Sequence, residues 1–261
     1  MISAGIDCGA KTTKVVLVKE GKIIGRSKGL TGFDQNRAIL EAWNQALKNA
    51  GVSAEQVKRI CGTGSGKDAV KSVLPGTEEL VNDLKAMGKG ANFFFPRART
   101  VVDVGAEEGR AVKVDERGNP LDFAINEKCA AGAGAFIESM ARALETPLEQ
   151  MGPLALSSEK EIPMNAQCAI FAESEVVGLI HGKAEKRDIS RAIHDAMASR
   201  IVSMIRRIGI HEDVVMMGGV AYNPGFVEAM KRQVPLSQLF IPEGPEFGMA
   251  VGAALAAARE A

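Results

Sequence analysis

The sequence predicts an α/β protein built from two similar halves that face each other across a cleft. An apolar stretch that ends in Asp-x-Gly occurs at Asp7 and again at Asp103. Each stretch is followed by alternating apolar and polar residues interrupted by a turn, which is the pattern of a β-hairpin. Apolar residues at helical spacing then follow in both halves. A strand unit that recurs in this way indicates an internal duplication of the fold.

The predicted elements of the first half are three strands within residues 2–29, a helix over residues 36–51, a short strand within residues 57–67 and a helix within residues 77–95. Glu20 and Gly21 supply a tight turn between the second and third strands. Gly51 ends the first helix, because glycine adopts the left-handed conformation common at a helix C-terminus. Pro96 ends the last helix and sets the predicted boundary between the halves.

The predicted elements of the second half are three strands within residues 99–126, helices from about residues 133, 169 and 189, a strand at residues 213–217 and an alanine-rich helix over residues 247–260. We expect the last helix to pack back on the first half. The predicted subdomains are therefore residues 1–96 with about 245–261, and residues 97–244. Two mixed sheets flanked by helices around a cleft are typical of an actin-like architecture.

The composition argues against several classes of function. Lys+Arg and Asp+Glu both number 32, which leaves no net positive charge to favour nucleic acid. No apolar run approaches the ~18–20 residues that cross a bilayer, and the first residues lack the pattern of a signal peptide. With 46% hydrophobic residues among 261, the chain can bury an ordinary core. We therefore expect a cytoplasmic protein without a nucleic-acid or membrane partner.

The two Asp-x-Gly turns predict a site for a nucleotide and its metal ion. Glycine lets the backbone approach phosphate closely, because no Cβ blocks it. A carboxylate at the end of each strand can orient Mg²⁺, and Asp7 and Asp103 are the candidates. A third turn, in "MMGGVAYN", can lie flat beneath a purine and ribose. The residues predicted to contact ATP or ADP are Gly9, Ala10, Lys11, Thr12, Thr13, Gly105, Ala106, Gly218, Gly219 and Val220.

Each of these features has a simpler interpretation. The first turn could be an ordinary β-turn with polar tips, since "DCGAKTTK" lacks the frame of a P-loop. The third turn could need glycine only for a positive φ. Glu107 could position the water that attacks a terminal phosphate, or it could be a solvated loop charge, and we favour the solvated interpretation for Glu108. The occurrence of all three turns in one chain favours the nucleotide site.

Two of the four cysteines, Cys129 and Cys168, precede predicted helices. The N-terminal end of a helix stabilises a thiolate, but a 4Fe-4S cluster needs four ligands and one chain supplies two. Two chains would supply four, so a cluster shared between subunits is one interpretation. The others are two unrelated buried cysteines, or a redox pair that forms a disulfide. Cys8 and Cys61 are expected to be small buried hydrophobes.

Five segments together resemble a known family. "GIDCG", "VVDVGAEEGR", "NEKCAAGAG", "CAIFAESEV" and "MMGGVAYN" occur in this order in the BadF/BadG/BcrA/BcrD ATPase family, which includes ATPase subunits of benzoyl-CoA reductases and activators of 2-hydroxyacyl-CoA dehydratases. The resemblance covers nearly the whole chain. It implies the actin-like ATPase fold of the acetate-kinase, sugar-kinase, heat-shock chaperone and actin superfamily, with two ribonuclease-H-like subdomains. It also implies that Cys129 and Cys168 bind one 4Fe-4S cluster per dimer and that Gly218 and Gly219 contact the nucleotide.

The details of the motifs most resemble the smaller ATPase subunit of an ATP-dependent, class I benzoyl-CoA reductase. Dehydratase activators usually have Gly-Gly-Gln-Asp where this chain has Gly105-Ala106-Glu107-Glu108, and a threonine where it has Ala133. The resemblance implies that ATP hydrolysis drives an electron from the cluster to catalytic reductase subunits, with reduced ferredoxin as the donor. It implies a heterodimer with a homologous ATPase subunit in the cell, or a homodimer in isolation.

Three alternative functions remain open at this point. One is the activator of a 2-hydroxyacyl-CoA dehydratase, which would work as a pair of identical chains. Another is a sugar or N-acetylglucosamine kinase on the same fold, which would have no use for cysteines at two helix starts. The third is a nucleotide-binding assembly module without turnover.

Overall fold

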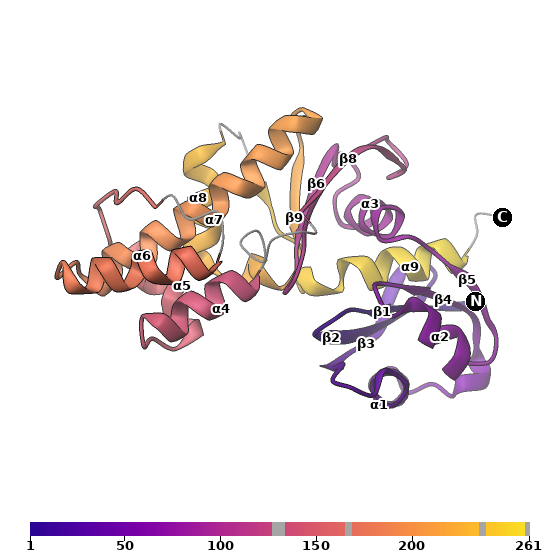
Figure 1. Ribbon diagram of the computed structural model, residues 1–261. Coiled ribbons are helices and arrows are strands. Elements are labelled where there is room, and N and C mark those ends of the chain that lie inside the picture. The colour runs from indigo at the N-terminus through magenta and orange to yellow at the C-terminus, as the bar shows by residue number, and fades with distance from the viewer. Residues whose placement is uncertain (127–133, 165–168, 235–238, 259–261) are drawn as a thin grey trace.

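Figure 1 presents the computed structural model of the chain, which describes residues 1–126, 134–164, 169–234 and 239–258. The predicted cluster ligands Cys129 and Cys168 lie outside these described residues. Within them, the chain forms two five-stranded sheets with helices on both sides of each.

The first sheet has the strand order β3-β2-β1-β4-β5. Its strands are β1 (Ile2–Cys8), β2 (Thr12–Lys19), β3 (Lys22–Leu30), β4 (Val57–Thr63) and β5 (Thr77–Leu80). β1 is antiparallel to β2 and parallel to β4. The turn between β2 and β3 has positive φ at Glu20 (51°) and Gly21 (72°), which matches the twist of the two strands that it joins. The predicted opening of three strands is therefore confirmed.

The second sheet has the strand order β10-β9-β6-β7-β8. Its strands are β6 (Thr100–Val104), β7 (Gly109–Val114), β8 (Pro120–Asn126), β9 (Val214–Met217) and β10 (Leu239–Phe240). β6 is antiparallel to β7 and parallel to β9, as β1 is to β2 and β4. Asp7 near the end of β1 and Asp103 near the end of β6 therefore occupy equivalent positions. The repeated topology confirms the predicted actin-like ATPase fold.

The helices are α1 (Gln35–Ala50), α2 (Lys67–Val73), α3 (Asp83–Phe94), α4 (Gly134–Ala143), α5 (Leu148–Leu156), α6 (Ala169–His181), α7 (Lys186–Ile208), α8 (Pro224–Gln233) and α9 (Gly248–Ala258). α1 and α2 share a core with the first sheet through Ile39, Trp43 and Val70. α4, α5, α7 and α8 share a larger core with the second sheet, around residues such as Phe136 and Ile193. No helix in the described part of the chain is long and apolar enough to cross a membrane.

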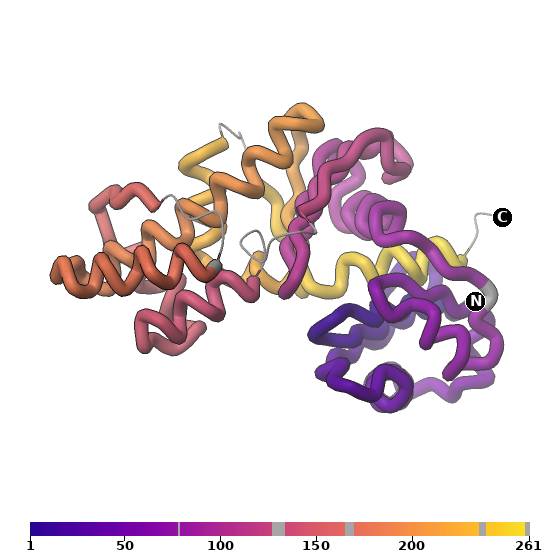
Figure 2. Tube along the Cα trace, in the orientation of Figure 1, coloured from indigo at the N-terminus to yellow at the C-terminus, as the bar shows by residue number. Residues whose placement is uncertain are grey.

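Helices α3 and α9 lie between the two sheets (Figure 1). One buried cluster there contains Cys61 of the first sheet, Val101 and Val215 of the second, and Met249 of α9. Figure 2 shows the yellow C-terminal helix running beside α3 and β1, which are far from it in the sequence. The two halves are therefore joined by a continuous apolar layer and not by the connecting chain alone.

The helix predicted within residues 77–95 is partly wrong. α3 begins only at Asp83, because residues 77–80 form β5, which pairs in parallel with β4 and places Thr77 opposite Ile60. Hydrogen bonds to a neighbouring strand outweigh the weak local preference of this segment for helix. The side chain of Asn82 then accepts a hydrogen bond from the Lys85 amide and caps the start of α3.

α3 and α9 approach each other closely because their facing residues are small. A Cβ added to Gly252 would lie 1.8 Å from the carbonyl oxygen of Ala86. A Cβ added to Gly90 would lie 2.0 Å from the carbonyl oxygen of Gly248. Neither position can hold a side chain unless the two helices move apart.

We expect Gly252→Ala to lower the free energy of unfolding by about 1–3 kcal/mol, the usual cost of overpacking a tight core. Chemical denaturation monitored by circular dichroism measures the change. Gly29→Ala is the matched control, since nothing lies within 4 Å of a Cβ added to that exposed residue. We expect the control to stay within about 0.5 kcal/mol of the wild type. Equal stability of the two variants would contradict the close approach of α3 and α9.

Candidate functional site

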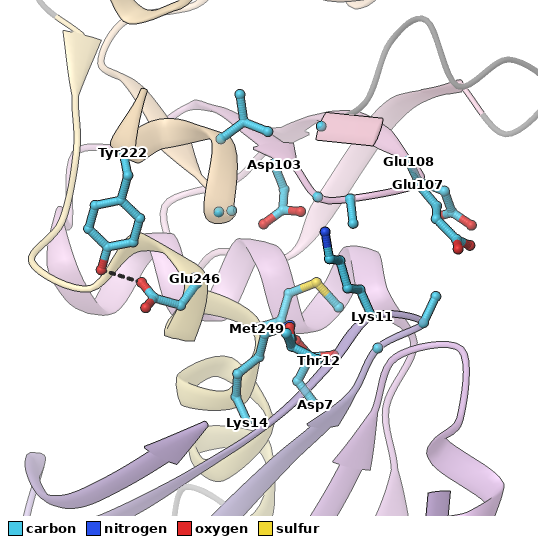
Figure 3. Close-up of a pocket in the computed structure, with 18 of the residues that line it drawn as sticks. Asp7, Lys11, Thr12, Lys14, Asp103, Glu107, Glu108, Tyr222, Glu246 and Met249 are labelled. Carbon is cyan, nitrogen blue, oxygen red and sulfur yellow. Dashed lines mark hydrogen bonds and ion pairs between the residues drawn. The ribbon is translucent and has the colours of Figure 1, made fainter. Parts of the chain in front are cut away.

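The three predicted turns meet at one cavity of about 610 Å³. This volume is in the range of small-molecule sites. The predicted site residues that line it are Asp7, Gly9, Ala10, Lys11, Thr12, Asp103, Gly105, Ala106, Glu107, Gly218, Gly219 and Val220. Figure 3 shows side chains of both sheets converging on this space. The fold therefore brings together segments that the sequence only suggested were related.

The first turn connects β1 to β2 and holds a buried carboxylate. The Gly9 amide donates to the carbonyl of Thr12 (3.2 Å) and closes the turn. Asp7 is buried beneath it, and Lys14 Nζ donates to Asp7 Oδ2 at 2.9 Å. Lys14 itself is mostly buried, so this ion pair is shielded from water. Lys14 stands in the motif "DCGAKTTK" but was not among the predicted site residues.

Thr13 differs from the rest of the first turn, because it does not line the cavity. Its side chain is buried, and its hydroxyl lies 3.0 Å from that of Thr31 and 3.7 Å from Cys8 Sγ. Thr31 in turn donates to the carbonyl of Gly9 at 2.7 Å. Thr13 therefore supports the turn from behind, in the position of a structural residue.

The second turn connects β6 to β7 and is bonded to the start of α4. The Gly134 amide donates to the carbonyl of Gly105, and the Ala135 amide donates to the carbonyl of Ala106, both at 2.8 Å. These bonds satisfy two of the amides that a helix leaves free at its N-terminus. The turn and the start of the helix are therefore bonded directly to each other.

Asp7 and Asp103 form a pair of buried carboxylates at the cavity. Burial raises the pKa of Asp103 to about 6; Arg110 opposes this rise and the charge of Asp7 adds to it. Burial also raises the pKa of Asp7, against the lowering effect of Lys14. In Figure 3 the Asp103 carboxylate points into the cavity. A divalent cation at this place would relieve both desolvation and repulsion.

This donor set fits Mg²⁺, which is usually held by one or two carboxylates together with water and phosphate oxygens. Among the described residues, no group of three or more histidine, cysteine, aspartate or glutamate side chains is arranged to hold a metal ion. A metal between Asp7 and Asp103 would therefore take its remaining ligands from water or from a bound anion.

An ion pair at the cavity connects the two halves. Arg110 of β7 bonds Asp83 of α3 at 2.8 Å and also bonds Glu108. Asp83 additionally accepts a hydrogen bond from the Gly64 amide at 3.0 Å. Neither Arg110 nor Asp83 was among the predicted site residues. Arg110 stands in the motif "GAEEGR", whereas Asp83 lies in a helix start that gives no local sign of a site.

Glu107 and Glu108 complete the second turn, and their carboxylates lie apart from the aspartates. Figure 3 shows both carboxylates well to the side of Asp7 and Asp103. Glu107 is exposed, at the rim of the cavity. The interpretation of Glu108 as a solvated loop charge is wrong, because its carboxylate is bonded to Arg110 and only partly exposed.

The third turn follows β9 and requires glycine. Gly218 has a φ of 88°, and a Cβ there would lie 2.3 Å from the carbonyl oxygen of Val104. Its amide donates to the carbonyl of Pro245 at 3.0 Å. Gly219, by contrast, has no heavy atom within 4 Å of an added Cβ, which leaves its cavity side open to a ligand.

Polar side chains beside the third turn form a small network. The Tyr222 hydroxyl donates to Glu246 at 2.5 Å (Figure 3). Lys28 Nζ bonds the same carboxylate at 3.1 Å. Burial and the neighbouring Glu246 raise the pKa of Tyr222 to about 12. All three residues line the cavity, and sequence reasoning missed them. Tyr222 stands in the quoted motif, but its partners lie far from it in the chain.

Cys8 and Cys61 are free and buried, which confirms the interpretation of both as buried hydrophobes. Cys129 and Cys168 lie outside the described residues, but the helices that follow them are described. α4 and α6 contact each other and run in the same direction (Figure 1). The first turn of α6 exposes Ile170 (72%) and Phe171 (71%) to solvent.

The chain matches the model of the BadF/BadG/BcrA/BcrD ATPase family over residues 4–257. It is 33% identical over 261 residues to the 2-hydroxyisocaproyl-CoA dehydratase activator of Clostridioides difficile, in an alignment that covers 100% of this chain and 96% of that protein. It is 30% identical over 265 residues to a benzoyl-CoA reductase component of Thauera aromatica, in an alignment that covers 97% of this chain and 92% of that protein.

A solved structure of a 2-hydroxyisocaproyl-CoA dehydratase activator from Clostridium difficile, with bound ADPNP, superposes with a TM-score of 0.89. It is 32% identical to this chain, and the alignment covers 98% of this chain and 94% of that one. The likeness therefore extends over both sheets and the cavity between them.

The raised pKa of Asp103 predicts a stability that falls as pH rises. Below about pH 4 the Asp103 carboxyl is protonated in both the folded and the unfolded chain, so it has no effect on stability. Between about pH 4 and 6 it ionises in the unfolded chain first, which lowers the free energy of unfolding. Above about pH 6 the whole decrease, on the order of 3 kcal/mol, is present. Asp103→Asn removes this loss, so its gain over the wild type should grow from pH 5 to pH 7.5. Urea unfolding without divalent cations measures it.

Asp122→Asn is the matched control for that experiment, since Asp122 is exposed on β8. We expect its effect on the free energy of unfolding to stay within about 0.5 kcal/mol. A gain for Asp103→Asn that stays constant from pH 5 to pH 7.5 would show that the carboxyl does not titrate in this range.

Proposed function

Because the chain belongs to the BadF/BadG/BcrA/BcrD ATPase family, we propose that it hydrolyses ATP in order to activate an electron for an acyl-CoA enzyme. The observation that carries the proposal is the pair of buried carboxylates, Asp7 and Asp103, in one cavity with three glycine turns. A metal-bound triphosphate would supply the cation that these carboxylates need and the oxygens that the turns can bind.

In this proposal the triphosphate lies between the first two turns. Asp7 and Asp103 would hold Mg²⁺, which would supply positive charge to offset the negative charge of the phosphate oxygens. Gly9 to Thr12 and Gly105 with Ala106 approach the phosphates with their backbone. Thr13, which the sequence placed among the phosphate contacts, acts from behind the turn instead.

The nucleoside lies toward the third turn. Gly218 and Gly219 present a flat backbone without side chains, and Val220 adds an apolar surface beside them. The Tyr222–Glu246 network borders the same end of the cavity. Glu107 is the candidate to position the attacking water, which requires the rim of the cavity to close over the terminal phosphate.

The family also implies a 4Fe-4S cluster, and we propose Cys129 and Cys168 as its ligands. When bound, such a cluster stores and passes one electron at a low potential. Support comes from the described neighbours of the cysteines: Cys168 directly precedes α6, which packs on α4, and the first turn of α6 exposes Ile170 and Phe171. An apolar surface of this kind suits a second, related chain that supplies the other two thiolates.

The partner enzyme is one of two kinds. The motifs "GAEEGR" and "NEKCAAGAG" favour the ring-reducing subunits of a benzoyl-CoA reductase, with a homologous ATPase subunit in the dimer and reduced ferredoxin as the donor. The identities favour a 2-hydroxyacyl-CoA dehydratase, since they are 33% to an activator and 30% to the reductase component. Co-purification under anaerobic conditions decides: a stable heterotetramer supports the reductase, and a separable homodimer supports the activator.

We expect Asp103→Asn to lower Mg²⁺-dependent ATP hydrolysis by about a hundredfold or more, since it removes charge where the metal and the transition state need it. Phosphate release at several Mg²⁺ concentrations measures the rate. The exposed Asp122→Asn variant should hydrolyse ATP at the wild-type rate. An unchanged rate in Asp103→Asn would remove Asp103 from the catalytic site.

We expect Cys129→Ser and Cys168→Ser each to abolish iron binding after anaerobic reconstitution, from about four irons per dimer to almost none. ADP binding should survive, because neither cysteine belongs to the nucleotide site. Iron content and absorbance are the readouts. Cys61→Ala is the control, since Cys61 is buried in the core and should not affect iron content. Full iron content in both serine variants would end the ligand assignment.

A further inference from the structure

Four cations line the cavity in the described part of the chain, and Lys11 differs from the other three. Lys14 and Arg110 are mostly buried and bonded to acidic partners, Lys14 to Asp7 within the first half and Arg110 to Asp83 and Glu108. The amine of Lys28 is occupied by Glu246 beside the third turn. The Lys11 side chain is 47% exposed, as that of Lys28 is, but Lys11 lies at the mouth of the cavity, where the first and second turns meet.

The partner of Lys11 comes from the opposite half. Its amine forms an ion pair with Glu138, which lies on α4 and is 29% exposed. The mouth where they meet is a shallow depression that is also lined by Ala106 and Glu107 of the second turn. In Figure 3 the amine of Lys11 points toward the space in front of Asp103. One cation is thus within reach of a carboxylate of one half and of the place proposed for the terminal phosphate.

A triphosphate would compete strongly for this cation. An ion pair between partly exposed side chains contributes little to stability, so it breaks easily. A hydrogen bond between an ammonium group and a phosphate oxygen is charge-assisted at both ends and is among the stronger ones in proteins. Lys11 can therefore leave Glu138 at little cost when a terminal phosphate arrives.

Loss of the Lys11–Glu138 ion pair would remove a contact of α4. The first amides of that helix are bonded to the carbonyls of Gly105 and Ala106, so α4 belongs mechanically to the second turn. Glu138 is the point on α4 that the first half holds through Lys11. Release of Glu138 removes a contact between the halves at the mouth, while Arg110 and Asp83 still join them elsewhere at the cavity.

We propose that Lys11 exchanges partners: it binds Glu138 when the terminal phosphate is absent and binds that phosphate when a nucleoside triphosphate is present. The inference rests on the proposed function, since it requires a triphosphate in the cavity. It assigns to Glu138 the role of a competitor for Lys11, and so predicts that the two partners of one ion pair have opposite effects on nucleotide affinity.

The test measures the affinity of the purified full chain for Mg²⁺·ADPNP and for Mg²⁺·ADP by calorimetry. Lys11→Met should weaken ADPNP binding by about ten- to a hundredfold, and ADP binding much less. Glu138→Gln should tighten ADPNP binding by about two- to fivefold, because it frees Lys11. In the Lys11→Met background, Glu138→Gln should give no gain.

Glu149→Gln is the matched control, since Glu149 lines the same cavity from the first turn of α5. Removal of its charge tests the general attraction of an anion to a less negative cavity. Glu149→Gln should change the affinity for ADPNP by the same factor in the wild type and in the Lys11→Met variant. Glu138→Gln should change it only in the wild type.

Three outcomes would overturn the exchange. If Glu138→Gln weakens ADPNP binding as Lys11→Met does, the ion pair is only a structural contact. If the gain from Glu138→Gln persists in the Lys11→Met background, it comes from general electrostatics. If Lys11→Met weakens ADP and ADPNP equally, Lys11 does not sense the terminal phosphate. Failure of the wild type to bind either nucleotide would instead refute the proposed function itself.

Discussion

The geometry of the site follows from two carboxylates buried at equivalent strand ends. Asp7 and Asp103 are both largely removed from water, and the pKa of each is raised by that burial. An arrangement of this kind costs stability as long as both groups are charged and no cation lies near them. The duplicated topology explains how it arises, because each sheet places the end of its central strand at the same cleft. A ligand that brings a metal ion is the simplest way to offset the cost.

The second turn connects this charge centre to the rest of the second half. Its carbonyls accept the first amides of α4, so a displacement of the turn displaces a helix. α4 in turn packs on α6, and both helices follow the segments that contain Cys129 and Cys168. The described structure thus links the second turn, where we propose that the phosphates bind, through α4 to α6. A displacement of the second turn would therefore also displace α4 and α6, because close-packed protein interiors transmit strain.

The contacts between the two halves are apolar at α3 and α9 and polar at the cavity. The layer of α3 and α9 is packed so closely that glycine is needed at Gly90 and Gly252, and it shares one apolar cluster with both sheets. At the cavity the contacts between halves are polar: Arg110 bonds Asp83, and Lys11 bonds Glu138 at the mouth. Apolar packing resists separation more than a partly exposed ion pair such as Lys11–Glu138 does. Movement of the halves is therefore easiest at the mouth, where Glu107 also lies.

The amino-acid sequence alone was enough to predict the repeated hairpin unit, the two aspartates and the three glycine turns, because each of these is written in a short segment with its own chemistry. It was also enough to predict that Gly51 ends α1, since a left-handed residue is needed there. The assignment of residues 77–80 to β5 came from the packed fold, because the hydrogen bonds that hold this strand come from β4. The same holds for Asp83 beside Arg110, for Glu138 beside Lys11 and for Glu246 beside Tyr222. The two members of each pair are far apart in the sequence, so no local pattern could predict that they meet. They come together only because the two sheets pack on α3 and α9.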